Sequence, residues 1–259
     1  MPYCRGALAP VITSDMPRYR DAMKSLKQTP KGSSNWRAKL GPMSFLGNDT
    51  YGDCAYAGFG HIWQVWAANN NKVLIPSTDC ILDNYSQGTG FQIGPPLLND
   101  NGAVLTQVIG QAMRRGFVIE DNTAWRMLGA TAVIEPDDLT SIMCCIDHFG
   151  CCYTGEALPA NAATEFENHI PWNDLSQPPS DGHCPPIVDY DYSTRTFYCM
   201  TWGGIQPQSF DSWLKYGLEA HAVLAYDWIG DNGLSPSGMS MATLDGLIRD
   251  LAGTLGAYS

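Results

Sequence analysis

Residues 46–68 constrain the fold more than any other part of the sequence. This stretch begins as a polar turn that contains glycine and continues as an apolar segment. Apolar residues recur there at helical spacing, and Trp63 and Val65 widen the apolar stripe beyond what a surface helix carries. The stretch therefore predicts a buried central helix.

Cys54 falls in the first turn of this predicted helix, because Asp53 is a good N-cap residue. The unpaired backbone N–H groups and the positive end of the helix dipole favour a thiolate there, whereas the neighbouring Asp53 carboxylate raises the thiol pKa. Gly52 lets a substrate approach the backbone closely. Cys54 is thus a candidate nucleophile, and the alternative is a cysteine that fills the core.

The charge balance excludes several classes of partner. The 259 residues can bury a substantial core and include 26 acidic but only 15 basic residues, for a net charge of −11. We therefore expect no nucleic acid and no anionic membrane as partner, because both bind basic surfaces. The sequence has neither an apolar run long enough for a transmembrane helix nor the order of a secretion signal. These features predict a cytoplasmic location.

The nine cysteines are an odd number and include two adjacent pairs, Cys144-Cys145 and Cys151-Cys152, which make a poor disulfide framework. We expect free thiols in a reducing compartment. These pairs could also be drawn as a zinc site, but zinc ligands prefer a Cys-x2-Cys spacing. Because the run crosses a helix end and a strand start, its thiols point apart. Core packing is the preferred interpretation, with no metal and no cofactor.

The order of the elements predicts an α+β fold, with helices first, then strands, then a terminal helix. Residues 77–100 look irregular. The expected helices span residues 15–27, 54–68, 103–115, 135–150, 209–217 and 240–255, and the expected strands span residues 151–158, 187–192, 196–202 and 220–229.

Three segments follow from this order. Residues 1–45 are weakly patterned, and we expect them to wrap the core as an N-terminal arm. Residues 46–150 form a helical half that carries the cysteine motif. Residues 151–259 form a β-rich half that carries a histidine motif and the C-terminal helix.

His183 is the preferred base for Cys54. It follows Gly182 and a proline-rich loop and precedes a predicted strand, and a histidine at such a place can face a cleft. The alternative is a surface histidine without a catalytic role. His61 lies seven residues after Cys54 on the same predicted helix. This is about 10 Å along the axis, too far to activate the thiol directly.

These motifs, in this order, resemble those of papain-like cysteine peptidases. In that family a Gln-Gly-X-Cys-Gly-Ser-Cys-Trp stretch starts the central helix, and residues 48–55 (Asn-Asp-Thr-Tyr-Gly-Asp-Cys-Ala) match it in register. The family's His-Ala-Val-X-X-Val-Gly-Tyr strand looks like residues 183–190, and its Asn-Ser-Trp-Gly strand looks like residues 200–203. The resemblance covers residues 46–203. Similar sequences with a shortened motif occur in bacteria and their phages.

The resemblance implies a papain-like fold in which the central helix packs on an antiparallel β half. It implies that Cys54 attacks an acyl carbon and that His183 takes the thiol proton. Asn48, together with the N–H of Cys54, would hold the oxyanion. The substrate-binding residues would be Gly52, Asp53, Gly182 and Trp202.

The sequence departs from the family pattern at several positions, among them Asn48 in place of the glutamine, Ala55 in place of the tryptophan and the residue that orients the histidine. The asparagine that orients the histidine falls at Met200, whose side chain cannot accept the imidazole N–H. Thr201, Asp189 and Asp191 are the candidates to replace it, and the alternation of a strand lets only some of them point inward.

The function implied is hydrolysis of an amide or peptide bond in a peptide or protein substrate, without a cofactor. The alternative is a catalytically inactive papain-fold protein, such as a phage virion or assembly component. Its partners would be copies of itself or other virion proteins, and its location would be the virion.

Overall fold

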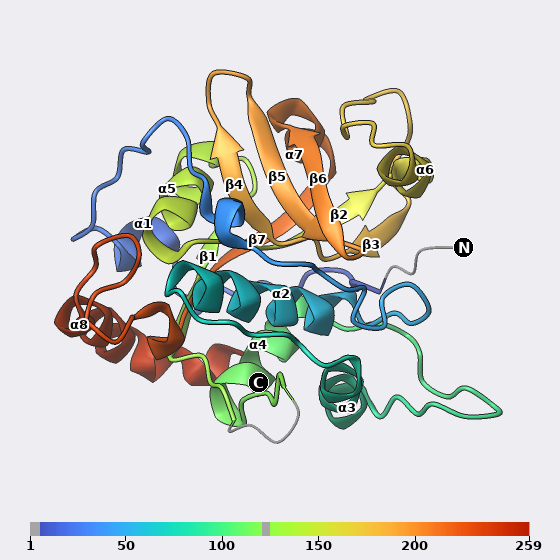
Figure 1. The fold of residues 1–259 in the computed structure, drawn as a ribbon, viewed down its shortest axis with the longest axis horizontal. Coiled ribbons are helices and arrows are strands. Elements are labelled where there is room, and N and C mark those ends of the chain that lie inside the picture. Colours follow the sequence, from blue (N-terminus) through green and yellow to red (C-terminus); the bar gives the residue numbers. More distant parts are fainter. Residues whose placement is uncertain (1–5, 121–124, 259) are drawn as a thin grey trace.

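The computed structural model describes residues 6–120 and 125–258, and Figure 1 shows their arrangement. The long helix α2 (Cys54–Asn69) crosses the middle of the molecule. Most strands lie above α2 in this view, and the helices α3, α4 and α8 lie below it.

The helices are α1 (Tyr19–Ala22), α2 (Cys54–Asn69), α3 (Thr78–Thr89), α4 (Leu105–Arg114), α5 (Leu139–Phe149), α6 (Ala162–Glu167), α7 (Phe210–Tyr216) and α8 (Met241–Leu251), with 3-10 turns η1 (Trp36–Lys39), η2 (Tyr226–Trp228) and η3 (Ala252–Tyr258). The strands are β1 (Ala130–Ile134), β2 (Tyr153–Leu158), β3 (Asp181–His183), β4 (Ile187–Asp191), β5 (Thr196–Thr201), β6 (Gly204–Ser209) and β7 (Gly217–Leu224).

Helix α2 is buried on every side over residues 54–66, as the width of its apolar stripe predicts. The Phe59 ring stacks on Tyr153 of β2 with ring centroids 4.3 Å apart. The Tyr153 hydroxyl donates to the carbonyl of Ala55 at 2.9 Å, and the Trp66 indole donates to the carbonyl of Phe149 at 2.8 Å. These contacts fix the start and the end of α2 against the strands and against α5.

The strands form two antiparallel sheets, one in the order β1-β7-β2-β3 and one in the order β4-β5-β6. An isolated bridge between Cys152 and Ile187 connects them. His183 on β3 pairs with Glu156 on β2. The architecture is therefore α+β, with a helical N-terminal half and a buried central helix packed on a C-terminal antiparallel β half, as predicted.

The segment before α2 contacts both halves of the molecule. The N–H of Val133 on β1 donates to the carbonyl of Pro17 at 2.8 Å. The N–H of Ser34 donates to the carbonyl of Tyr190 on β4 at 3.0 Å. Farther along, the Trp36 and Arg37 N–H groups donate to the Asp189 carboxylate. The segment thus contacts β1 and β4, and its role as an arm around the core stays a prediction.

Some predicted boundaries are wrong, for physical reasons. Residues 78–89 form α3 although the region looked irregular, because Ser77 caps the helix and Ile81, Leu82 and Tyr85 are buried along one face. Strand β1 was missed because all five of its residues are buried, so it shows no alternation. The sequence also did not predict strand β6, helix α6 or the short strand β3. The helix expected at residues 15–27 is shorter, because α1 covers only four of those thirteen residues.

The paired cysteines are buried in the core, as the preferred interpretation predicts. The eight cysteines that the structure describes are free thiols, and Cys145 donates to the carbonyl of Cys151 at 3.3 Å. Across residues 6–120 and 125–258, no three or more His, Cys, Asp and Glu side chains are grouped so as to hold a metal ion.

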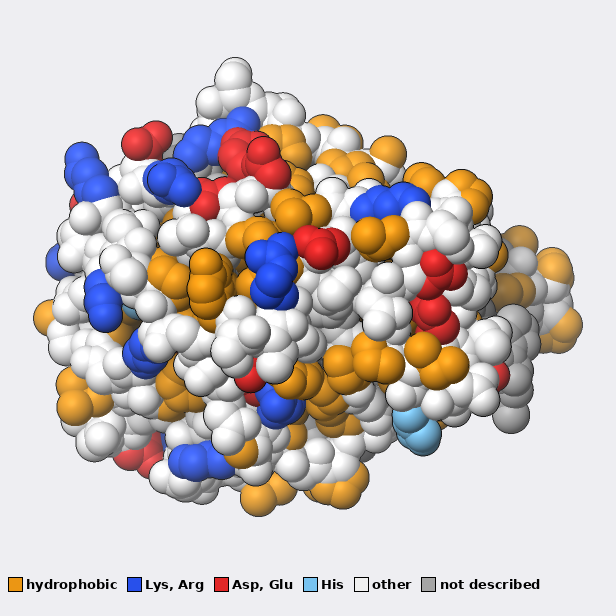
Figure 2. Space-filling model, turned by 90° about the horizontal axis from the view of Figure 1, so that it is seen from above, with side chains coloured by type: hydrophobic (Ala, Val, Ile, Leu, Met, Phe, Trp, Pro, Cys, Tyr) orange, Lys and Arg blue, Asp and Glu red, His pale blue; other side chains and the backbone are white. Residues whose placement is uncertain are grey.

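Charged side chains of both signs are interspersed with apolar ones on the face shown in Figure 2. The Arg37 guanidinium pairs with the buried Asp189 carboxylate at 2.9 Å. Among the described helices, none combines the length and the apolar character needed to cross a membrane.

Candidate active site

Cys54 is the first residue of α2, with Asp53 at the N-cap position, as predicted. The Asp53 side chain does not cap the helix, because the carboxyl group is fully buried and neither of its oxygens has a hydrogen-bond partner. Burial raises the pKa of this carboxyl well above its usual range, and the nearby Asn48 amide offsets only part of that effect. Asp53 is therefore a buried group beside the thiol rather than an exposed substrate contact.

The Cys54 thiol is buried too, which reverses the expected effect of the helix terminus. Burial is the main cause that raises the pKa of Cys54 to about 12; a backbone hydrogen bond from Gly6 lowers this pKa, and the Asp53 carboxyl raises it. The low-dielectric surroundings outweigh the helix dipole because they penalise the charged form directly. At neutral pH the sulfur in this closed arrangement is a thiol.

His183 ends strand β3 and is held on two sides. Its Nε2 lies 2.7 Å from the hydroxyl oxygen of Thr201, the last residue of β5. Its ring stacks on Trp202, with centroids 4.6 Å apart and ring planes 24° apart. The prediction of a histidine near a strand is confirmed, but the side chain is buried rather than exposed at a surface.

Among the three candidates to replace the orienting asparagine, Thr201 is the residue that bonds His183. Asp189 instead accepts hydrogen bonds from the backbone of Trp36 and Arg37. Asp191 accepts them from Ser193 and Thr194 in an exposed turn.

One small cavity of about 10 Å³ brings the predicted catalytic residues together. Its volume is close to that of one water molecule. It is lined by Phe45, Asn48, Cys54, Ala57, Gly58, His61, His183, Cys184, Met200, Thr201 and Trp202. Cys54, His183 and Asn48 thus meet at one place, whereas Gly52, Asp53 and Gly182 are not part of this lining.

Asn48 lies in the loop before α2 and is 3% exposed. Its side-chain Nδ2 donates to the carbonyl of Tyr51 at 3.1 Å. This bond fixes the amide beside the cavity that Cys54 also lines.

His61 is the site residue that sequence reasoning set aside. It lines the same cavity as Cys54, although it is two helical turns further along α2. Burial lowers its pKa to about 4, so the ring is neutral at physiological pH, and its Nδ1 has no hydrogen-bond partner. The available signal was that positions seven residues apart share one helix face.

The backbone of residues 6–8 passes beside Cys54 and the strand that carries His183. The Ala7 N–H donates to the carbonyl of Gly182 at 3.0 Å, on the strand that carries His183. On the other side, the Leu8 N–H donates to the carbonyl of Ala103 at 2.9 Å, and the Ala103 N–H donates to the carbonyl of Gly6 at 2.7 Å. We call residues 6–8 the strap, because they run between two walls and are bonded to both.

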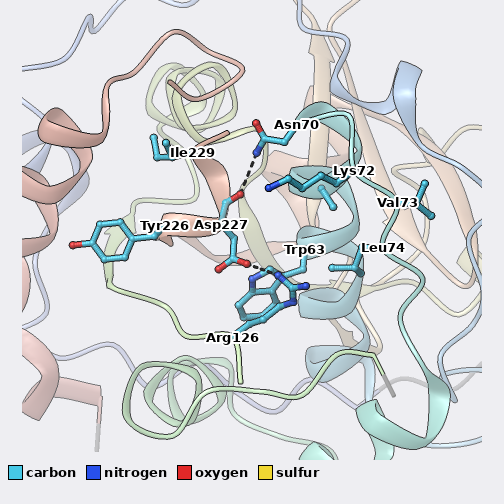
Figure 3. Close-up of a pocket in the computed structure, with 10 residues that line it drawn as sticks. Trp63, Asn70, Lys72, Val73, Leu74, Arg126, Tyr226, Asp227 and Ile229 are labelled. Carbon is cyan, nitrogen blue, oxygen red and sulfur yellow. Dashed lines mark hydrogen bonds and ion pairs between the residues drawn. The ribbon is translucent and has the colours of Figure 1, made fainter. Parts of the chain in front are cut away.

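A larger hollow of about 400 Å³ lies near the other end of α2 (Figure 3). Trp63 and Arg126 line it, and Arg126 pairs with Asp227 there. Arg126 also pairs with Glu120. Another lining residue, Asn70, is sixteen positions beyond Cys54, or about 24 Å along a helix axis. This hollow is therefore separate from the candidate active site.

The sequence matches no protein-family model and no curated protein sequence. The structure, however, is similar to several solved ones. Xylellain, a cysteine protease from Xylella fastidiosa, superposes with a TM-score of 0.63 over 85% of this chain and 96% of that one, at 12% identity. The fold is papain-like.

Two further papain-like structures agree. Digestive procathepsin L2 proteinase from the larval midgut of Tenebrio molitor gives a TM-score of 0.58 at 12% identity, over 85% of this chain and 78% of that one. The cysteine protease and lectin-like domains of Cwp84, a surface layer associated protein of Clostridium difficile, give a TM-score of 0.56 at 11% identity. This match covers 86% of this chain and 63% of that one. The papain-like fold expected from the motifs at residues 46–203 is thus confirmed over most of the chain.

Proposed function

We propose that this protein is a papain-like cysteine hydrolase that cleaves an amide or peptide bond through Cys54 and His183. The observation that carries the proposal is that both side chains line one cavity of about 10 Å³, at a helix N-terminus and at the end of a strand. The substrate class is a peptide or protein, as expected for a papain-like site.

The chemistry uses groups already in place. When the Thr201 hydroxyl accepts the Nε2–H of His183, the basic lone pair of the imidazole is on Nδ1. His183 then takes the Cys54 proton while the sulfur bonds to the acyl carbon, and it returns that proton to the leaving amine as the C–N bond breaks. Water hydrolyses the thioester, which releases the carboxylic acid and restores the thiol.

Asn48 and the backbone N–H of Cys54 are the proposed oxyanion donors. Asn48 lines the cavity beside Cys54, and its amide is held by the carbonyl of Tyr51. A donor held in advance stabilises developing negative charge without reorganisation at the moment of reaction.

The strap must leave before a substrate reaches the sulfur. It is the reason why Cys54 is buried on the side of Gly6, and burial is the main cause of the high thiol pKa. Its displacement would restore solvent to the site and let the helix terminus and His183 lower that pKa.

Gly6→Ala opens the site for the test. A Cβ at position 6 would lie 1.9 Å from the carbonyl oxygen of Gly52, so the strap cannot keep its place. Gly41→Ala is the matched control, because a Cβ there meets nothing within 4 Å. Ala7→Pro is a second opening variant, since it removes the N–H that bonds Gly182.

We expect iodoacetamide to label Cys54 at pH 7 at least tenfold faster in Gly6→Ala than in the wild type or Gly41→Ala. We also expect Gly6→Ala to hydrolyse members of a fluorogenic peptide library. Adding Cys54→Ser should abolish both the fast labelling and the hydrolysis. His183→Ala should remove hydrolysis and return the labelling to that of an ordinary thiol. A variant that labels fast but cleaves no peptide would contradict the hydrolase proposal.

No observation on the described residues favours the alternative of a virion or assembly component. The segment beside Cys54 is the protein's own strap, which is bonded to Gly182 and Ala103.

A further inference from the structure

A second thiol lies beside the proposed nucleophile. Cys184 directly follows His183 in the sequence and lines the same cavity of about 10 Å³ as Cys54. A backbone hydrogen bond from Cys184 reaches the Cys54 sulfur. Both residues are free thiols, and Cys184 has no part in the hydrolysis proposed above.

Two contacts place the Cys184 sulfur against the first two turns of α2. It shares a hydrogen bond with the Tyr153 hydroxyl, and that hydroxyl donates to the carbonyl of Ala55, the residue after Cys54, at 2.9 Å. A Cβ on Gly58 would lie 3.3 Å from the Cys184 sulfur. Because residues four positions apart are neighbours on one helix face, positions 54 and 58 lie one above the other. Both thiols therefore lie on the same face of α2.

We propose that Cys184 is a resolving thiol, which forms a reversible disulfide with Cys54 once hydrogen peroxide has oxidised the Cys54 sulfur to a sulfenic acid. Without a second thiol, a sulfenic acid is oxidised further to a sulfinic acid, and that step is irreversible. A thiol within reach attacks the sulfenic acid first and stops the oxidation at a disulfide. Cys184 thus protects the nucleophile while it blocks it.

The reaction consumes one hydrogen peroxide and releases two water molecules. The Cys54 thiolate attacks one peroxide oxygen, the O–O bond breaks, and the leaving hydroxide takes up the thiol proton to become water. The Cys184 sulfur then attacks the Cys54 sulfur, so that the S–S bond forms while the S–O bond breaks, and the second water leaves with the Cys184 proton. The two sulfurs lose two electrons and the peroxide gains them. A dithiol such as dithiothreitol reverses the change by thiol–disulfide exchange.

The disulfide needs a side-chain movement within this site. The Cβ atoms of a disulfide lie only about 3.8 Å apart, so the two residues must be in contact. The backbone hydrogen bond from Cys184 to the Cys54 sulfur supplies that contact. Rotation about the Cα–Cβ bond of Cys184 moves its sulfur between staggered positions while the backbone stays in place.

Peroxide reaches the thiols in the opened state. Burial is the main cause that raises the pKa of both Cys54 and Cys184, which keeps the thiols protonated and slow to oxidise in the closed arrangement. We therefore expect oxidation in the same state that admits a substrate. The loss of hydrolysis on oxidation rests on the proposed function, whereas the disulfide does not.

The test treats the wild type and the opened Gly6→Ala chain with hydrogen peroxide and maps the disulfides by mass spectrometry of non-reduced peptides. We expect a Cys54–Cys184 disulfide that forms at least tenfold faster in Gly6→Ala. Dithiothreitol should then restore the labelling of Cys54 by iodoacetamide. Ala7→Pro serves as the second opened chain if Gly6→Ala does not fold.

Cys184→Ser, added to the opened chain, is the deciding variant. Its Cys54 should become a sulfinic acid, and dithiothreitol should not restore the labelling. Cys184→Ala is the second choice if the serine variant does not fold. Cys199→Ser is the matched control, because the Cys199 thiol is also buried but bonds Gln208 at 3.3 Å and is not part of the cavity lining. It should recover as the parent chain does.

The outcomes separate this proposal from the proposed function. Equal recovery of Cys54 with and without the Cys184 thiol overturns the resolving role, and so does a disulfide between Cys54 and another thiol, such as Cys4. A Cys54–Cys184 disulfide in a chain that hydrolyses no peptide supports the resolving role and refutes the hydrolase activity. Hydrolysis that peroxide abolishes irreversibly, without this disulfide, supports the hydrolase and overturns the resolving role.

Discussion

The imidazole Nε2 of His183 and the hydroxyl oxygen of Thr201 lie 2.7 Å apart, and this hydrogen bond joins the ends of β3 and β5. The residue at the position expected for an asparagine, Met200, lines the same cavity but has no acceptor to offer. A hydroxyl one position later thus bonds the ring.

Thr201→Val tests this replacement. The substitution keeps the shape of the side chain but removes the oxygen, so His183 loses its Nε2 partner in a buried site, at a cost of about 1–3 kcal/mol. In an opened chain that carries Gly6→Ala, kcat/KM for peptide hydrolysis should fall about tenfold or more. Thr201→Ser keeps the hydroxyl and should retain most of the activity. Equal rates for the Val and Ser variants would contradict an orienting role.

Glu156 should make the protein less stable as the pH rises. Burial raises the pKa of this carboxyl from 4.5 to about 8, with the Gln208 amide donating to it at 2.6 Å. Between these two values the folded state binds more protons than the unfolded state, so stability declines as the pH rises, by an amount on the order of a few kcal/mol. Thermal melts at pH 5 and pH 8 measure the decline.

Glu156→Gln is the comparison for these melts, because a neutral amide cannot titrate. We expect the Tm difference between wild type and Glu156→Gln to shift in favour of the variant from pH 5 to pH 8. A difference that does not change with pH would show that Glu156 has the same pKa in the folded and unfolded states.

His61 should have the opposite pH dependence. Burial lowers its pKa from 6.5 to about 4, so the unfolded state binds more protons between these values. Its contribution to stability is therefore complete above pH 6.5 and is lost as the pH falls towards 4. In urea unfolding at pH 4.5 and pH 7, His61→Gln should lose less free energy of unfolding between pH 7 and pH 4.5 than the wild type does. An equal loss in both proteins would contradict the burial of a neutral ring.

Phe59→Ala should be among the most destabilising single changes. Phe59 is fully buried in α2 and stacks on Tyr153 at 4.3 Å. Removing the ring leaves a cavity in a close-packed core and should lower the free energy of unfolding by about 3–5 kcal/mol. Chemical denaturation measures this. Tyr192→Ala is the surface control, because Tyr192 is 58% exposed, and it should change stability by less than about 1 kcal/mol.

The fold could be predicted where one pattern carries through a whole element. The apolar run of α2, its start at Cys54 and the aromatic and β-branched residues of β5 are local features, and the structure confirms the helix and the strand that they predict. Helix α3 and strand β1 were missed because their local patterns are weak, and tertiary burial decides their conformation.

The candidate site divides in the same way. Residue type and spacing selected Cys54 and His183, the resemblance to papain-like motifs added Asn48, and all three line one cavity. The inclusion of His61 and the choice of Thr201 over Asp189 depend on how strands and helix meet in space.

The sequence by itself determined the α+β order, the buried helix with Cys54 at its start and the papain-like arrangement of motifs, because these depend on short-range periodicity and on residue types. Only the tertiary structure decided that the thiol is protonated and that the strap packs against the backbone at Gly52, Gly102 and Gly182. Burial and backbone contact between Gly6, Gly52 and Gly102 arise from segments far apart in the chain, and no local pattern encodes them.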